Sequence, residues 1–211
     1  MILRENCARS FRHFGFYRPL VGTLFLKRTS LIQYGFLCFF SKPAAERAIY
    51  RAIARQRARR FVEIGVGRAV RAKRMLAVAS RFHAREQLSY TGIDLFEDRP
   101  ADNPGLPLKL AHQLLRPMAG KLQLVPGDAY SGLCRSANTL VQSDIIVVTG
   151  NTEDEQMRPA WFYFPRMLHD KTCIFVAAES GEKEESHVET VTQEEISELS
   201  LASRSAVRHA A

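Results

Sequence analysis

Residues 60–69 read RFVEIGVGRA and decide the fold of this chain, because a strand, a glycine turn and the start of a helix follow one another within ten residues. The Phe, Val and Ile side chains favour a buried strand. Gly65 and Gly67 then allow a tight turn that brings bare backbone N–H groups close to a ligand at a helix N-terminus. Glu63 precedes the turn, and a carboxylate is costly inside a strand core. The stretch therefore predicts a site for a nucleotide-like ligand.

The same alternation of strands and helices continues along the chain. Apolar runs predict further strands at residues 89–94, 122–125, 144–149 and 171–178. Amphipathic segments predict helices before and after the glycine turn, and again at about 106–115, 130–140 and 153–168. On the helix after the turn, we expect Arg71 to lie on the solvated side. Five strands alternating with helices indicate an α/β fold, an open, doubly wound and mostly parallel sheet with helices on both faces.

Length and charge divide the chain into three parts. At 211 residues, it can form one α/β domain with extensions. We expect a basic, aromatic N-terminal extension at 1–42, the α/β domain at 43–180, and an acidic, poorly ordered C-terminal tail at 181–211 that carries at most one helix near 192–201. Residues 1–60 carry 13 Lys and Arg against 2 acidic residues, so the net charge of +8 arises from the N-terminal region.

The N-terminal extension ends in the apolar run LIQYGFLCFF, residues 31–40, which is too short to cross a bilayer. Three interpretations remain for this run: a helix packed on the domain, a segment that lies in a membrane interface, or a leader. The basic extension suits contact with an anionic membrane surface or an acidic protein. Nucleic acid is not expected as a partner, because the basic residues have no interleaved aromatic stacking motif.

The cysteines and histidines give no sign of a disulfide framework or a metal site. The four cysteines, Cys7, Cys38, Cys134 and Cys173, are scattered, and no pair has the spacing of metal ligands. We therefore expect a reduced, cytoplasmic protein without a bound metal, held at a membrane only if the N-terminal extension brings it there.

Polar residues follow the predicted strands where parallel sheets bind ligands, at the carboxyl ends of the strands. Gly65 and Gly67 end the first strand, Asp94 ends the second, and Asp128 follows the third in the sequence PGDA. A carboxylate at the second strand end can accept hydrogen bonds from ribose hydroxyls. A carboxylate after the third strand can accept one from an exocyclic amine, while a neighbouring backbone N–H donates to a ring nitrogen.

These motifs resemble those of the class I S-adenosylmethionine-dependent methyltransferases. The sequence VEIGVG is similar to the first motif of that family, GID to its second-strand acid, and GDA to its third-strand motif. The resemblance covers about residues 43–180. It implies strand order 3-2-1-4-5, with the glycines at the methionine part of the cofactor, Asp94 at the ribose and Asp128 at the adenine. The implied cofactor-binding residues are Glu63, Gly65, Gly67, Asp94, Asp128 and Ala129, where Glu63 orders the turn or contacts the amino group.

The chain also departs from the family pattern. Members usually complete a seven-stranded sheet with a C-terminal hairpin, whereas here only about thirty polar residues follow the fifth strand. We therefore expect strands six and seven to be missing or reduced, and the fifth strand to be an edge that the N-terminal arm covers. The sequences TGN after the fourth strand and AAE after the fifth do not favour a metal-assisted mechanism.

The sequence predicts a methyltransferase that transfers a methyl group from S-adenosylmethionine to an acceptor, a small molecule or a protein. No catalytic residue is assigned. Glu153, Asp154 and Glu155 are candidates for a general base by position alone, and we expect at least one of them to cap a helix. Two alternatives remain. The first is an inactive S-adenosylmethionine-binding or scaffold domain, and the second is a nicotinamide-dependent oxidoreductase, whose G-x-G-x-x-G fingerprint is incomplete because Val70 replaces the third glycine.

Overall fold

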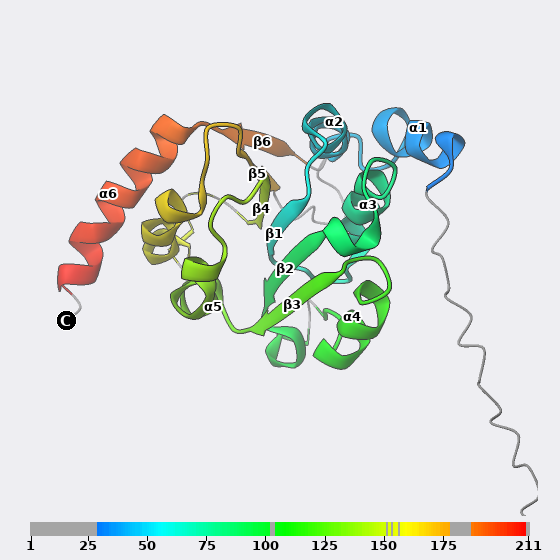
Figure 1. The fold of residues 1–211 in the computed structure, drawn as a ribbon. Coiled ribbons are helices and arrows are strands. Elements are labelled where there is room, and N and C mark those ends of the chain that lie inside the picture. The colour runs from blue at the N-terminus through cyan, green and yellow to red at the C-terminus, as the bar shows by residue number, and fades with distance from the viewer. Residues whose placement is uncertain are drawn as a thin grey trace, which may run out of the picture.

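The protein is built around a six-stranded sheet (Figure 1). The computed structural model describes residues 29–101, 104–150, 152, 154, 155, 157–177 and 187–209, and for 205–209 the backbone only. The strand order is β3-β2-β1-β4-β5-β6, in which β6 alone pairs antiparallel. The strands are β1 Arg60–Ile64, β2 Ser89–Asp94, β3 Lys121–Pro126, β4 Ile145–Thr149, β5 Cys173–Ala177 and β6 Val188–Val191. The α/β class and the order of the first five strands are as predicted.

Helices cover both faces of the sheet. The α-helices are α1 Leu31–Phe39, α2 Arg47–Gln56, α3 Val70–Ala79, α4 Leu108–Leu115, α5 Ala129–Ser136 and α6 Gln193–His209. Short 3-10 helices are η1 Arg85–Gln87, η2 Phe96–Asp98 and η3 Ala137–Thr139, and a longer one is η4 Arg158–Met167. The predicted helix at 153–168 is thus confined to 158–167, and it is wound as a 3-10 helix.

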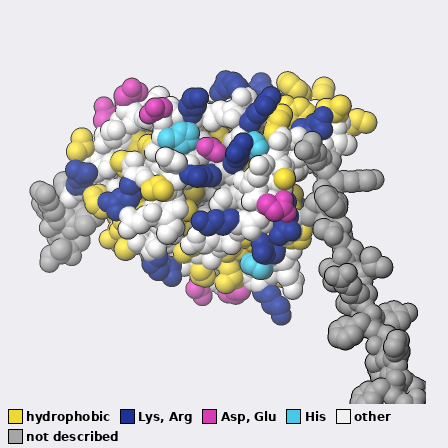
Figure 2. Space-filling view, in the orientation of Figure 1, with side chains coloured by type: hydrophobic (Ala, Val, Ile, Leu, Met, Phe, Trp, Pro, Cys, Tyr) yellow, Lys and Arg dark blue, Asp and Glu magenta, His cyan; other side chains and the backbone are white. Residues whose placement is uncertain are grey.

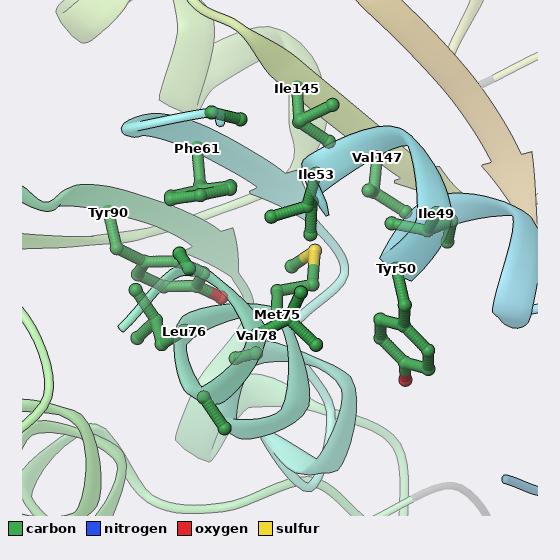
Figure 3. Packing of buried hydrophobic residues seen from close by; sticks show 14 of the residues in the cluster. Ile49, Tyr50, Ile53, Phe61, Met75, Leu76, Val78, Tyr90, Ile145 and Val147 are labelled. Atoms are coloured by element: carbon green, nitrogen blue, oxygen red, sulfur yellow. The ribbon is translucent and has the colours of Figure 1, made fainter. Parts of the chain in front are cut away.

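The first face of the sheet packs against α2 and α3 (Figure 3). Phe61 of β1 and Tyr90 of β2 point from the sheet toward Ile53 of α2 and Leu76 of α3, and each of these side chains is at most 2% exposed. Because side chains alternate along a strand, the residue after Phe61 faces the opposite side of the sheet. Glu63, two residues on, returns to the first face, beneath the glycine turn.

The second face packs against α5, η3, η4 and α6. Val62 and Ile64 of β1 face this layer. Its largest side chain is Trp161, which is fully buried against Phe164 with the ring centroids 4.4 Å apart. The indole N–H of Trp161 donates to the carbonyl of Thr152 at 3.2 Å, so the buried ring leaves no polar group unpaired.

The C-terminal region differs from the expectation of a poorly ordered tail and a five-stranded sheet. β6 pairs antiparallel with β5, matching Ile174 with Val191 and Ala177 with Val188. α6 then packs on η4 and buries Ile196 completely. The sheet therefore has a sixth strand, and β5 is not an edge covered by the N-terminal arm. The strand escaped prediction because its sequence, VETV, is short and follows an acidic stretch.

The apolar run at residues 31–40 forms α1, which packs on α2 and α3. Residues 1–28 of the predicted extension lie outside the described part of the chain. Within that part, no helix is long and apolar enough to cross a membrane.

Candidate ligand site at the carboxyl ends of the strands

The glycine turn lies between β1 and α3, where the strand order switches from β1 to β4. Gly65 and Gly67 have φ of 84° and 55°, in the left-handed region that favours glycine. A Cβ atom at Gly65 would lie 2.7 Å from Cβ of Thr149, so the neighbouring strand also excludes a side chain there. Ligands of open α/β sheets bind at this kind of switch point.

Asp94 links the end of β2 to the glycine turn. Its Oδ2 atom accepts a hydrogen bond from the backbone N–H of Gly67 at 2.5 Å. Its backbone carbonyl accepts one from Gly127 at 2.8 Å, which brings the end of β3 to the same place. Burial raises the pKa of Asp94, but hydrogen bonds from Arg99 and Gly67 outweigh it, so the pKa lies below its ordinary value. Asp94 is therefore a fixed carboxylate where the predicted ligand motifs meet.

Arg99 engages the same carboxylate from the loop after β2. Its Nε donates to Oδ1 of Asp94 at 2.6 Å and one terminal nitrogen donates to Oδ2 at 3.0 Å. The N–H of Phe96 supplies a further hydrogen bond to Oδ1, at 3.2 Å. With Gly67, these donors occupy the roughly four lone-pair positions of a carboxylate. A ribose hydroxyl can bind Asp94 only in place of one of them.

The loop that carries Arg99 also reaches the glycine turn. The backbone N–H of Leu106 donates to the carbonyl of Gly67 at 2.9 Å. A Cβ atom at Gly105 would lie 2.7 Å from Cδ of Arg99, so a larger residue there would displace the Arg99 side chain. The loop after β2 thus holds the Arg99 guanidinium against Asp94.

Glu63 is completely buried beneath the turn. Its Oε1 accepts from Nε of Arg71 at 2.8 Å and its Oε2 accepts from the hydroxyl of Tyr90 at 2.5 Å. Burial raises the pKa of Glu63, and the Arg71 guanidinium and the Tyr90 hydroxyl oppose that rise. The carboxylate is thus paired and hydrogen-bonded, which a buried charge requires.

Arg71 connects the buried Glu63 to the glycine turn. One of its terminal nitrogens donates to the carbonyl of Gly65 at 3.4 Å and to the hydroxyl of Thr149, and that hydroxyl donates to the same carbonyl at 2.9 Å. The Arg71 side chain is only 12% exposed, so the expectation that it lies on a solvated helix face was wrong. The reason is that α3 starts directly after the turn and directs this side chain back over the sheet. Glu63 acts on the turn through Arg71.

Asp128 forms the N-cap of α5. Its Oδ1 accepts from the backbone N–H of Ser131 at 2.9 Å and its Oδ2 from the Ser131 hydroxyl at 3.0 Å, and the first of these hydrogen bonds is the main cause that lowers the pKa of Asp128. The residue is exposed, so its carboxylate is accessible from solvent. Ala129 follows as the first residue of the helix.

The sequence predictions missed four side chains of this site: Arg71, Tyr90, Arg99 and Thr149. A buried acid in a strand requires a partner, so Glu63 itself was the signal that a cation and a hydroxyl lie nearby. Arg99 had no such signal, because it lies in a loop. Asp154 and Glu155, candidates for a general base, are exposed near the start of η4, and Glu153 lies outside the described residues.

Three surface cavities lie apart from the glycine turn. One adjoins β6 and α6, one adjoins the amino ends of β1 and β4, and one adjoins α4 and β3. Among the residues that the structure describes, no group of three His, Cys, Asp or Glu side chains could hold a metal ion. At the turn itself, the Arg71 and Arg99 side chains lie against the carboxylates.

No protein-family model and no curated protein sequence matches this chain. Solved structures do resemble it. An S-adenosylmethionine-dependent methyltransferase from Agrobacterium tumefaciens aligns at a TM-score of 0.44 and 13% identity, over 75% of this chain and 50% of that one. A geranyl diphosphate methyltransferase, solved with S-adenosylmethionine, aligns at a TM-score of 0.37 and 10% identity, over 70% of this chain and 48% of that one. The chain spans about half the length of both. These are likenesses of fold, and the roles of residues rest on the contacts described above.

Proposed function

We propose that the protein is an S-adenosylmethionine-dependent methyltransferase that methylates a small molecule or a protein. The observation that carries the proposal is the convergence on Asp94. The N–H of Gly67 bonds its carboxylate and the N–H of Gly127 bonds its carbonyl, so the glycine turn and the ends of β2 and β3 form one site. The three motifs that carry the resemblance to this family meet there.

The residues of the site fit the cofactor with one rearrangement. Asp94 would accept hydrogen bonds from the ribose hydroxyls once at least one of the two hydrogen bonds from Arg99 to its carboxylate is broken. The exposed Asp128 carboxylate would accept a hydrogen bond from the adenine amine, and the N–H of Ala129 lies beside it at the start of α5. Arg71, paired with Glu63 below the turn, would hold the glycine turn in place so that its backbone N–H groups meet the methionine part.

The bound sulfonium would supply an electrophilic methyl group. The residues of this chain would contribute position and alignment, which account for a large share of the catalysis of such transfers. Glu63 and Arg71 fix the turn, and Asp94 and Asp128 fix the nucleoside. No side chain of the described residues is assigned as a general base.

Calorimetric titration of the full chain with S-adenosylmethionine, S-adenosylhomocysteine and NAD⁺ tests the proposal. We expect the first two to bind and NAD⁺ not to bind. A companion assay follows the labelled methyl group of S-adenosylmethionine into small molecules and proteins of a cell lysate. Binding of NAD⁺ alone would support the oxidoreductase alternative, and binding of none of the three would refute the proposal.

One observation favours the second candidate, a binding or scaffold domain without turnover. Arg99 completes the hydrogen bonding of Asp94 from within the chain, so the site is internally satisfied without a cofactor. Binding of S-adenosylmethionine without transfer of its methyl group to any acceptor would support this candidate. Transfer to an identified acceptor would exclude it.

A further inference from the structure

Helix α1 exposes an unusual amount of apolar surface. Ser30 caps its N-terminus by accepting from the N–H of Gln33, and the helix itself, LIQYGFLCF, contains no charged residue. Four large apolar side chains of the helix are exposed, by 66% for Leu31, 86% for Ile32, 54% for Phe36 and 55% for Phe39. Phe40, which caps its C-terminus, is 69% exposed. Figure 2 shows them as a hydrophobic cluster at the upper right, where Figure 1 places α1.

These five side chains share one side of the helix. At 100° per residue, positions 31, 32, 36, 39 and 40 fall within one half of the helical wheel. Leu37 and Cys38 occupy the other half, are 6% and 2% exposed, and pack on the domain. The core therefore uses one face of α1, and the other is a continuous apolar surface of the kind that marks an interaction site.

Cations lie beside this apolar face, since Figure 2 shows Lys and Arg side chains next to the hydrophobic cluster. Lys42 follows the helix, and Arg51 of α2 lies near Cys38 on the side of α1 that packs on the domain, where it lowers the pKa of that thiol against the larger effect of burial. Both basic residues are exposed. Residues 29–60 contain seven Lys and Arg and one acid, Glu46, which is already engaged by Tyr50 and Arg74. The preceding residues 1–28 add six Lys and Arg and one acid to the same end of the chain.

We propose that the exposed face of α1 docks on an anionic lipid bilayer and lies in the plane of its interface. Apolar side chains on one face with cations beside them match the acyl boundary and the negative headgroups of such a surface. A nine-residue helix is too short to cross the bilayer. A symmetric contact with a second copy would instead bring like charges together, because the same surface meets itself across a two-fold axis.

Vesicle co-sedimentation of the full chain tests the proposal, with vesicles of phosphatidylcholine alone and of phosphatidylcholine mixed with phosphatidylserine. We expect binding to the mixed vesicles, weaker binding to the neutral ones, and a decrease as NaCl rises from about 0.1 to about 0.5 M. The double variant Ile32→Glu, Phe36→Glu should bind mixed vesicles about tenfold more weakly or worse, the scale of lost apolar burial. Leu201→Glu is the matched control, since Leu201 is 62% exposed on α6, and it should bind like the wild type.

Several outcomes would overturn the proposal. Absence of wild-type binding to mixed vesicles would do so, and so would unchanged binding by the double variant. Equal losses for the double variant and Leu201→Glu would show that the effect is not specific to α1. Sedimentation equilibrium provides the remaining check: a dimer that the double variant abolishes, without vesicle binding, would assign the face to a second copy. Thermal unfolding of each variant confirms that the fold is intact, as expected for exposed positions.

Discussion

Asp94 is the residue on which the proposed cofactor site depends most directly. Replacing it by Ala removes the carboxylate that would hold the ribose, and we expect S-adenosylhomocysteine to bind about 1–3 kcal/mol more weakly, the scale of hydrogen bonds to a charged group. Asp170→Ala, an exposed position before β5, should leave the affinity unchanged. Calorimetry measures both, and circular dichroism checks that each variant is folded. Unchanged affinity in folded Asp94→Ala would show that the ribose is not held there.

Arg99 competes with the proposed ligand for Asp94, so its removal should have the opposite effect on binding. In Arg99→Gln the ribose hydroxyls no longer have to displace a guanidinium, and we expect S-adenosylhomocysteine to bind about tenfold more tightly. The unliganded variant should unfold more easily, because Asp94 loses a buried partner. Arg68→Gln removes an exposed charge beside the same turn and should change neither quantity. A weaker affinity in Arg99→Gln would instead make Arg99 a ligand contact.

Arg71 neutralises the buried Glu63, and its loss should alter the pH dependence of stability. In Arg71→Met, burial raises the pKa of Glu63 without an adjacent cation to oppose it. A raised folded-state pKa favours the fold below the unfolded value, about 4.5, and this stabilisation is lost as pH rises through the folded-state pKa. We expect an unfolding free energy about 3–5 kcal/mol below wild type at pH ~7.5 and a smaller deficit at pH ~5.

Urea denaturation at both pH values measures this effect, and a control lies one turn along the same helix. The Arg74 side chain is 30% exposed where it pairs with Glu46, so Arg74→Met should cost less than about 1 kcal/mol. If the loss of unfolding free energy in Arg71→Met does not increase with pH, Glu63 remains protonated or solvated in the variant.

At the scale of elements, β1 was predicted at the start of the stretch 60–69, and β2 was predicted with the bounds that the structure shows, Ser89–Asp94. Buried parallel strands are nearly continuous apolar runs, and the glycines mark where the first one ends. β6 gave no comparable signal, because four residues of alternating character cannot be distinguished from a loop. The solvent exposure of Arg71 was predicted wrongly for a related reason. Helical periodicity indicates on which face of the helix a side chain lies, whereas the direction in which a long side chain extends over the sheet depends on tertiary packing.

β6 should protect β5 from solvent, and this prediction belongs to the same scale. Val191 is 7% exposed and pairs with Ile174, so Val191→Asp should loosen the strand pair at a cost of about 2–3 kcal/mol. We expect faster hydrogen exchange at the amides of residues 173–177 in this variant. Glu189→Gln, an exposed change on the same strand, should leave exchange unaltered. If Val191→Asp retained the protection, another segment would have to cover the edge of β5.

At the scale of the molecule, one sheet connects two separate cores, and the candidate site lies at the ends of its central strands. The sequence motifs could predict the location of the candidate site, because the carboxyl ends of parallel strands lie at one edge of the sheet regardless of the conformation of the loops. The partners of the site carboxylates could not be predicted, since they come from a helix and a loop whose approach is set by packing. The predicted acids Asp94 and Asp128 lie near each other, whereas Glu63 lies below the surface and reaches the turn through Arg71.

Because β1 contributes side chains to both cores, a ligand bound at its carboxyl end should stabilise the whole described domain as one unit. At a hundredfold excess over its dissociation constant, S-adenosylhomocysteine should add about 2.7 kcal/mol to the unfolding free energy. For a chain of this length, that corresponds to an increase in Tm of roughly 5–11 °C. Differential scanning calorimetry should show one transition that moves as a whole, while NAD⁺ at the same concentration leaves it in place. Two transitions, of which the ligand moves one, would mean that the two faces of the sheet unfold independently.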